Sequence, residues 1–237
     1  MPLKVSKGNM YPWVTHTHAH LGGECPHKCV YCYVDNPRFG RVPRYTGPVR
    51  LIENEFKLGY GSCKTIFIEH MNDLFASDVP DEFIRRIINH CLEWPNNTYV
   101  FQTKNPDRYN AYLNIMPRDC ILGTTIETNR DIPGISNAPV PQERAKAMMF
   151  LSANTAHRIL VTFKTFVTIE PVLDFDVDVL ANWIAMINPE FLNLGADSKN
   201  HNLPEPTVEK VMALVAKLHE YGIELREKHN LQRLKAK

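Results

Sequence analysis

The sequence predicts an α/β protein with parallel strands, because short β-rich runs alternate regularly with stretches of helical character. The β-rich runs are Trp13–His20, Lys64–His70, Thr98–Lys104, Cys120–Glu127, Thr162–Glu170, Glu190–Gly195 and, more weakly, Gly222–Arg226. The helical stretches are Asp81–Glu93, Pro106–Leu113, Pro141–Ala153, Val177–Ile187 and Pro206–Tyr221. Such an alternation fits βαβ units, which close as a full or partial barrel or wind as an open sheet.

Length and composition narrow the class of protein. A chain of 237 residues with 44% hydrophobic residues suits one globular domain, so we expect a single domain over residues 1–237. Lys plus Arg is 27 and Asp plus Glu is 26, so the overall charge does not indicate a nucleic-acid binder. No run approaches the roughly 18 apolar residues of a membrane span. The N-terminus lacks the apolar core of a signal peptide. These features predict a cytoplasmic protein with no membrane partner.

Three of the six cysteines, Cys25, Cys29 and Cys32, lie within eight residues, and Tyr31 directly precedes the third. Three thiolates in one loop can each hold one iron of a [4Fe–4S] cluster, and the fourth iron is then open to a small molecule. Zinc is the alternative metal, and its fourth ligand could be His27 within the same loop or one of His16, His18 and His20 just before it. This loop, residues 21–35, is the strongest signal in the sequence.

Polar residues follow the apolar part of nearly every predicted strand. They are His18, His20, Glu69, His70, Thr103, Lys104, Glu127, Glu170 and Asn193. In parallel α/β sheets, functional residues gather at the carboxyl ends of strands, so the sequence predicts a site there. His16, His18 and His20 alternate and therefore share one face of their strand.

The spacing Cys-x-x-x-Cys-x-aromatic-Cys resembles the signature of the radical S-adenosylmethionine enzymes. The segments Ile66–Phe75, Phe101–Lys104, Gly123–Asn129 and Thr168–Pro171 are similar to successive strand motifs of one subgroup. That subgroup is phage-associated, largely uncharacterised and distantly similar to spore photoproduct lyase. His70 and Asn72 depart from its usual residues, which puts a shared substrate in doubt but not the cofactor.

The resemblance implies a partial (β/α)6-type TIM barrel, with parallel strands and outer helices. It implies a [4Fe–4S] cluster whose open iron binds S-adenosylmethionine. An electron from a donor such as flavodoxin or ferredoxin then releases a 5′-deoxyadenosyl radical, which abstracts a hydrogen atom from the substrate. If the chain is phage-encoded, this chemistry belongs to the host cytoplasm.

The resemblance also implies roles for single residues. Cys25, Cys29 and Cys32 would ligate the cluster. Around S-adenosylmethionine it places Tyr31 and Tyr33 at the adenine, Glu69 at the methionine amine, Lys104 at the carboxylate, Glu127 at the ribose, and Thr125 and Asn129 nearby. Glu170 and His70 are the catalytic candidates.

An arginine-rich stretch after the cysteine loop suggests the substrate. Arg38, Arg41, Arg44 and Arg50, with Phe39 and Tyr45, suit phosphates and a stacked base. Together with the distant similarity, this favours a nucleotide or a modified, thymine-type DNA base as substrate. The residues expected to contact it are His18, His20, Arg41, Arg44 and Asn193.

Several alternatives stay open at the level of sequence. A radical enzyme of this kind could act on a carbohydrate or an amino acid instead. A zinc-stabilised nucleic-acid-binding module without catalysis, or a protein that only transfers electrons, would also carry the cysteine loop. The basic segment at about residues 228–237 suggests a C-terminal tail. Cys63, Cys91 and Cys120 have no assigned role, although Cys91 fits the buried face of a helix.

Overall fold

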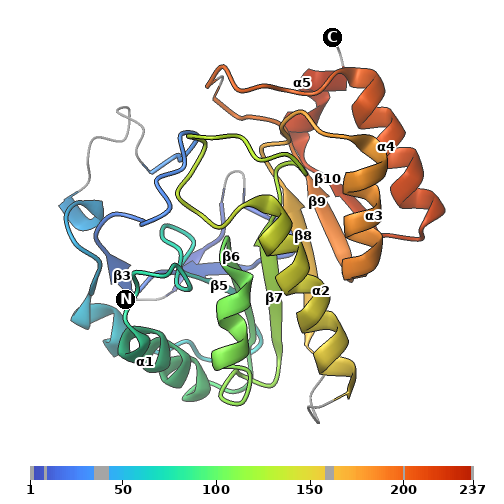
Figure 1. The fold of residues 1–237 in the computed structure, drawn as a ribbon. Coiled ribbons are helices and arrows are strands. Elements are labelled where there is room, and N and C mark those ends of the chain that lie inside the picture. The colour runs from blue at the N-terminus through green and yellow to red at the C-terminus, as the bar shows by residue number, and fades with distance from the viewer. Residues whose placement is uncertain (1–2, 8–9, 35–42, 158–162, 200, 236–237) are drawn as a thin grey trace. The chain divides into compact units, whose positions relative to one another are not determined.

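The computed structural model describes residues 3–7, 10–34, 43–157, 163–199 and 201–235, and only the backbone of residues 153–157. The chain folds into two compact units (Figure 1). The first comprises Met1–Lys28 and Cys32–Leu122, and the second comprises Cys29–Tyr31 and Gly123–Lys237. The boundary between the units, from Leu122 to Gly123, falls within strand β7 (Cys120–Thr125).

The first unit is built on a mostly parallel sheet. Its neighbouring strands are β1 (Lys4–Val5), β2 (His16–His18), β5 (Thr65–Ile68) and β6 (Thr98–Thr103), in that order. β1 is antiparallel to β2, whereas β2, β5 and β6 run parallel. A separate antiparallel pair joins β3 (Leu21–Gly22) to β4 (Arg50–Leu51), directly before the cysteine loop.

Helix α1 (Asp81–Leu92) completes the first unit. It begins after Pro80 and buries Ile84, Ile87, Ile88 and Cys91, so Cys91 lies on the buried helix face, as predicted. The described residues of this unit also contain the short 3-10 helices η2 (Pro43–Tyr45), η3 (Glu53–Lys57) and η4 (Pro106–Ala111). The last of these replaces the helix expected over Pro106–Leu113.

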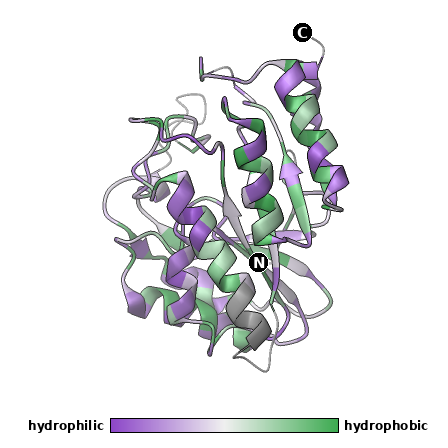
Figure 2. Ribbon diagram, turned by 45° about the vertical axis from the view of Figure 1, so that its right-hand side comes forward, coloured by the Kyte–Doolittle hydropathy of each residue, from purple (hydrophilic) through white to green (hydrophobic). Residues whose placement is uncertain are grey.

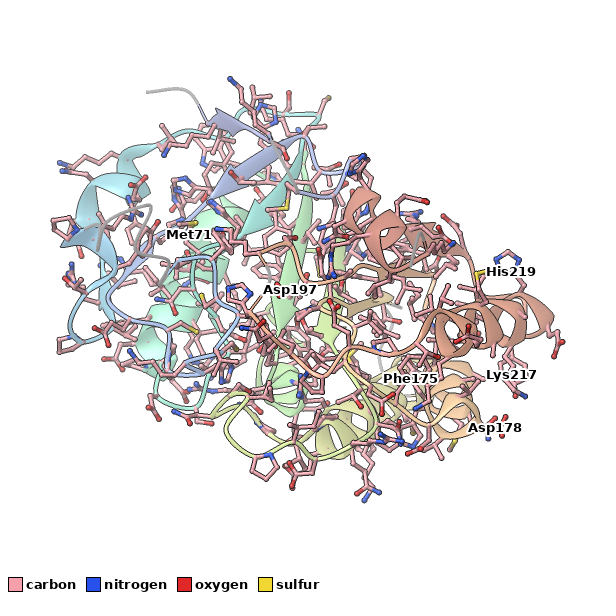
Figure 3. The ribbon with its side chains drawn as sticks, turned by 90° about the horizontal axis from the view of Figure 1, so that it is seen from above. Met71, Phe175, Asp178, Asp197, Lys217 and His219 are labelled. Carbon is pink, nitrogen blue, oxygen red and sulfur yellow. The ribbon has the colours of Figure 1, made fainter. Side chains whose placement is uncertain are left out.

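The second unit repeats the parallel arrangement with β8 (Lys164–Ile169), β9 (Phe191–Leu194) and β10 (Leu225–Glu227). Its longer helices within the described residues are α2 (Pro141–His157), α3 (Val177–Ile187) and α4 (Val208–Glu220). α3 and α4 lie side by side (Figure 1), and Lys217 Nζ of α4 lies 2.8 Å from Asp178 Oδ1 of α3 (Figure 3). The helices carry both hydrophobic and hydrophilic residues (Figure 2), as expected for helices that cover a sheet.

The prediction of a mostly parallel α/β fold is confirmed, although the strands are shorter than expected. The run Trp13–His20 yields only β2, and Lys64–His70 ends early because Glu69 adopts a φ of +60°. The basic segment predicted as a tail is folded as far as Lys235. It forms η5 (His229–Leu231) and α5 (Gln232–Lys235), with Leu231 and Leu234 buried, so apolar packing overrides its basic composition.

None of the helices within the described ranges is long and apolar enough to cross a membrane.

Gly23, two residues before Cys25, is fixed by a close backbone approach. Its φ is +88°, and a Cβ there would lie 2.1 Å from Pro48 O, a backbone atom that cannot rotate away. We expect Gly23→Ala to lower the free energy of unfolding by about 3 kcal/mol or more, measured by urea denaturation. Gly47→Ala is the matched control, because Gly47 has a φ of +72° but open space around its Cα. Gly47→Ala should lower the free energy of unfolding by only about 1 kcal/mol. Equal losses would mean that the contact with Pro48 carries no weight.

Candidate functional site

In the first unit, the cysteine loop is attached through His27. Cys25 is half-buried, whereas His27 is only 3% exposed. The Nε2 atom of His27 lies 3.0 Å from Oδ2 of Asp73, which follows strand β5. The next residue, Lys28, forms an exposed ion pair with Glu24 and adopts a φ of +46°, so the backbone turns sharply between the first two cysteines.

Asp73 is the centre of this attachment. Its carboxylate accepts hydrogen bonds from Thr103 Oγ1 (2.6 Å), the backbone N–H of Lys104 (2.7 Å) and the backbone N–H of Phe75 (3.0 Å). Burial alone would raise the pKa of the Asp73 carboxyl, yet the His27 imidazole and the donated hydrogen bonds hold that pKa below its ordinary value. The arrangement brings His27, Asp73 and the half-buried Lys104 together where β5 and β6 end.

Tyr33 attaches the far side of the loop to the first unit. Its hydroxyl donates to the backbone oxygen of His70 (2.7 Å) and to Met71 Sδ (2.9 Å; Met71 is labelled in Figure 3). Burial raises the pKa of Tyr33, with a smaller contribution from Cys32. Within the described residues, His70 Nδ1 is buried without a hydrogen-bond partner. Burial also lowers the pKa of His70, so the neutral imidazole is favoured there.

Glu69 is buried in the first unit, with only 2% of its surface exposed. Its Oε1 accepts from the backbone N–H of His20 (2.5 Å) and lies 2.8 Å from His20 Nδ1, and its Oε2 accepts from the N–H of Leu21 (3.2 Å). His20 Nε2 lies 2.8 Å from Tyr60 Oη. The carboxylate therefore organises the end of β2, and its contact with the methionine amine stays a prediction.

His18 and His20 pack together, since their ring centroids are 4.5 Å apart in an edge-to-face arrangement. This agrees with the predicted shared face of the strand. Both side chains are buried, with 6% and 0% exposure, among Phe56, Tyr60 and His90. Their contact with a substrate stays a prediction. His20 has Glu69 and Tyr60 as partners, whereas His18 Nε2 is buried without a hydrogen-bond partner among the described residues.

The buried His18 makes the stability of the fold depend on pH. Burial lowers its pKa to about 4, assisted by His20 and opposed by Glu55. In the unfolded chain the pKa is about 6.5, so the unfolded state binds the proton more tightly. Stability is therefore full above about pH 6.5 and falls as the pH drops towards about 4. We expect His18→Gln to flatten this fall in urea denaturation, whereas His219→Gln, at an exposed position on α4, should not. Parallel curves for wild type and His18→Gln would contradict the assignment.

The described arginines of the proposed phosphate-binding stretch have structural partners. Arg44 pairs with Glu55 and donates to the backbone oxygen of Ala19. Arg50 donates to backbone oxygens of its own loop, including that of Thr46 (2.9 Å). Both side chains therefore brace the segment that carries them. Arg38 and Arg41 lie outside the described residues.

In the second unit, a triad formed by the half-buried Tyr31 and the buried Glu127 and Arg144 holds residues 29–31. The hydroxyl of Tyr31 donates to Glu127 Oε1, and Arg144 Nη1 on α2 donates to Glu127 Oε2 (2.7 Å) and to the backbone oxygen of Thr125 (2.6 Å). Glu127 is 1% exposed and Arg144 is 4% exposed. Burial raises the pKa of Tyr31 well above its ordinary value, and the nearby Glu127 and Cys29 raise it further.

The neighbouring candidates of the second unit also have protein partners. Thr125 is buried at the end of β7. Asn129 Nδ2 donates to Asp176 Oδ2 (3.0 Å), and Asn129 Oδ1 accepts from the N–H of Asp176 (2.7 Å). Asn193 is 2% exposed on β9, and its Nδ2 lies 3.4 Å from Thr168 Oγ1. These contacts order the ends of the strands, and direct contact with a ligand stays a prediction.

Glu170, at the end of β8, has a basic partner. Lys228 Nζ lies 2.7 Å from its Oε2, and both side chains are largely buried. Asn230 Nδ2 donates to Glu170 Oε1 (2.8 Å) and to the backbone oxygen of Ala196 (2.7 Å). Gly195 makes room for this group, since a Cβ there would lie 2.8 Å from Asn230 Oδ1. The segment after β10 thus supplies two site residues.

Sequence reasoning missed several residues of these networks, among them Tyr60, Arg144, Lys228 and Asn230. Arg144 stands on a helix among other charged residues and Lys228 in a basic segment, so no local pattern distinguishes either of them. The only sequence feature pointing to Arg144 is Glu127 itself, because a carboxylate that follows a buried strand needs a cationic partner if it is buried. Asp73 did stand inside the recognised motif Ile66–Phe75, where a functional role and a cap of the following turn were equally open, and its bond to Phe75 shows the cap.

In the part of the chain that the structure describes, no group of three or more His, Cys, Asp or Glu side chains is arranged as a metal site. The donor chemistry of the loop nevertheless suits iron. Cys25, Cys29 and Cys32 are partly exposed thiols on one short loop, and soft sulfur ligands are what iron–sulfur clusters use. His27, one of the nitrogen donors that a zinc site could use, faces Asp73.

Residues 27–186 match a family described as "Protein of unknown function (DUF5131)". The chain belongs to this family. Among curated proteins, none matches the sequence. This member of DUF5131 does have structural relatives, which are radical S-adenosylmethionine enzymes.

A spore photoproduct lyase complexed with dinucleoside spore photoproduct has a TM-score of 0.65 and 10% identity, over 94% of this chain and 80% of that one. A mutant of that lyase with bound S-adenosylmethionine and the same dinucleoside has a TM-score of 0.57 and 11% identity, over 90% of this chain and 63% of that one. SuiB from Streptococcus suis, bound to S-adenosylmethionine, has a TM-score of 0.62 and 10% identity, over 93% of this chain and 52% of that one. The DUF5131 chain therefore shares their fold, and it spans only about half the length of SuiB.

Proposed function

We propose that this protein is a radical S-adenosylmethionine enzyme. One observation carries the proposal. A chain with the fold of such enzymes also has the spacing Cys-x-x-x-Cys-x-aromatic-Cys in the loop that follows its first strands. Cys25, Cys29 and Cys32 would hold a [4Fe–4S] cluster, and the parallel strands would form a partial (β/α)6-type barrel. Membership of the phage-associated subgroup is part of the same proposal.

When bound, S-adenosylmethionine and the cluster supply a radical that removes a hydrogen atom from the substrate. The protein's own residues would bind and orient S-adenosylmethionine. Lys104, whose backbone is fixed on Asp73, would pair with the methionine carboxylate through a charge-assisted contact. Tyr31 and Tyr33 would border the adenine with rings that their hydroxyl groups already fix. Glu170 and His70 are the proposed catalytic residues, the former with Lys228 as its counter-ion.

The proposed substrate is a nucleotide or a modified, thymine-type DNA base. The support is the shared fold with a lyase solved in complex with a dinucleoside photoproduct. Arg44 contributes less to this proposal than its sequence suggested, because Glu55 and Ala19 occupy its guanidinium. A flavodoxin or ferredoxin would supply electrons. The reducing cytoplasm, of a host if the chain is phage-encoded, suits an exposed cluster.

The experiment that tests the proposal is anaerobic reconstitution with iron and sulfide. Dithionite and S-adenosylmethionine are then added, and 5′-deoxyadenosine is quantified by mass spectrometry. We expect a brown protein that forms 5′-deoxyadenosine. A colourless protein that contains zinc and forms none would instead support a zinc-stabilised binding module. A brown protein that does not bind S-adenosylmethionine would support simple electron transfer.

Lys104→Ala should weaken binding of S-adenosylmethionine by roughly tenfold to a hundredfold, because a charge-assisted hydrogen bond is lost. The iron content should not change, since Lys104 is not a proposed ligand. Equilibrium dialysis on the reconstituted protein measures both quantities. Lys146→Ala, at an exposed position on α2, is the control. Equal affinity for wild type and Lys104→Ala would remove Lys104 from the site.

A further inference from the structure

His27 differs from its neighbours in the cysteine loop. Cys25, Cys29 and Cys32 are half-buried, whereas His27 is 3% exposed although it stands between the first two cysteines. Its Nε2 atom lies 3.0 Å from Asp73 Oδ2, on a segment 46 residues away in sequence. This close contact lacks the alignment of a hydrogen bond. It is still specific, because a buried imidazole or a buried carboxylate alone would be costly.

The carboxylate of Asp73 is a fixed binding partner for His27. Three donors from the protein, namely Thr103 Oγ1 and the N–H groups of Phe75 and Lys104, already fix its carboxylate. Asp73 is 7% exposed, so these bonds lie away from solvent. The position of the Asp73 carboxylate is therefore fixed by the rest of the protein, and His27 binds to a group that is already in place.

The loop backbone needs such a tether. Lys28 has a φ of +46°, a left-handed conformation that an L-residue other than glycine adopts only at an energetic cost. Its N–H donates to Cys25 O over 3.3 Å, which is a long bond for holding a strained turn. The exposed ion pair of Lys28 with Glu24 adds little, because such pairs are screened by solvent. The contact between His27 and Asp73 is a buried interaction that can offset the strain.

We propose that His27 and Asp73 are a positioning pair, which holds the turn Cys25–Lys28 in its ligand-bearing conformation before any metal binds. The inference rests on the proposed function, which makes Cys25 a cluster ligand. In this role His27 is not a metal ligand. Zinc coordination by His27 would require its Nε2 to leave Asp73 or its other nitrogen to turn outward.

Hydrogen exchange on the metal-free, full-length protein tests the pair directly. In His27→Ala, peptides that cover residues 24–29 should exchange about tenfold faster, because loss of a buried partner raises the population of the open loop. Peptides of α1 should exchange as in wild type, which excludes a general loss of stability. His27→Gln retains an N–H donor and should recover part of the protection. Lys28→Gln, which removes the neighbouring exposed charge, is the matched control and should match wild type. Wild-type exchange in His27→Ala would overturn the proposal.

Reconstitution separates positioning from ligation. His27→Ala should take up iron and sulfide about tenfold more slowly than wild type. It should reach the same iron content and the same electron paramagnetic resonance spectrum after reduction. A changed spectrum at full iron content would make His27 a ligand and overturn the inference. If wild type takes up no iron, the proposed function fails, and the exchange experiment still decides the role of the pair in the metal-free loop.

Discussion

Arg144→Met should lower the free energy of unfolding by about 3–5 kcal/mol, because it leaves the Glu127 carboxylate buried without its cation. The exposures of 1% for Glu127 and 4% for Arg144 exclude water from the pair. Arg144 Nη1 also donates to Thr125 O, and that acceptor would lose its donor as well. Methionine retains much of the apolar volume of the arginine stem, so the loss reflects charge and hydrogen bonding rather than a cavity.

Urea denaturation of Arg144→Met measures this loss, and the chain offers a matched control. Arg130 pairs with Asp174 and Asp176, but its side chain is 39% exposed, so Arg130→Met should cost less than about 1 kcal/mol. Adding Glu127→Gln to Arg144→Met should recover part of the stability, since the isolated charge is then removed. A cost for Arg144→Met no larger than that for Arg130→Met would contradict the buried pair.

The pair of Glu127 and Arg144 also helps to hold the cysteine loop. Glu127 accepts from Tyr31, and the N–H of Val30 donates to Ile135 O (3.0 Å), so residues 29–31 are held in the second unit from both sides. Arg144 thus fixes Glu127, and Glu127 fixes Tyr31. We therefore expect Arg144→Met to disturb the segment around Cys29 as well as global stability.

The sequence predicted the elements of this fold better than their ends. Apolar periodicity located α1 and its buried Cys91, because burial of one helix face is a local property of the sequence. The end of β5 was misplaced because Glu69 adopts a positive φ, which the sequence does not signal for a glutamate.

Residue types at the candidate site were predictable, whereas their partners were not. Polar residues after apolar strands marked Glu69, Glu127 and Glu170 as candidates. Their partners, His20, Arg144 and Lys228, come from other elements, and the choice depends on how the chain packs. Lys228 was assigned to a tail because its neighbours are basic, although Leu231 and Leu234 carry that segment into the core.

The cysteine motif was visible because its spacing is local. Its attachment was not, since His27 and Tyr33 make contacts across 46 and 37 residues of sequence. His27 illustrates the difference. The sequence offered it as a zinc ligand, whereas the structure places it against Asp73.

Cys29→Ala should abolish formation of 5′-deoxyadenosine, because a [4Fe–4S] cluster deprived of one of its three thiolates loses its attachment or its geometry. The fold should survive, since Val30 and Tyr31 hold residues 29–31 through contacts that do not use the Cys29 thiol. Iron content, 5′-deoxyadenosine and the thermal unfolding temperature are measured on the same anaerobic preparation. We expect iron and product to fall together while the unfolding temperature stays near that of the metal-free wild type.

Cys63→Ala is the control for Cys29→Ala. Cys63 is exposed and lies outside the loop, so its loss should leave both iron and product unchanged. The control also separates ligation from the general removal of a thiol that could bind iron adventitiously. Product formation by Cys29→Ala at the wild-type level would contradict the proposed cluster site. If both variants lost iron equally, iron binding would depend on thiols in general, and the motif spacing would no longer support a radical enzyme.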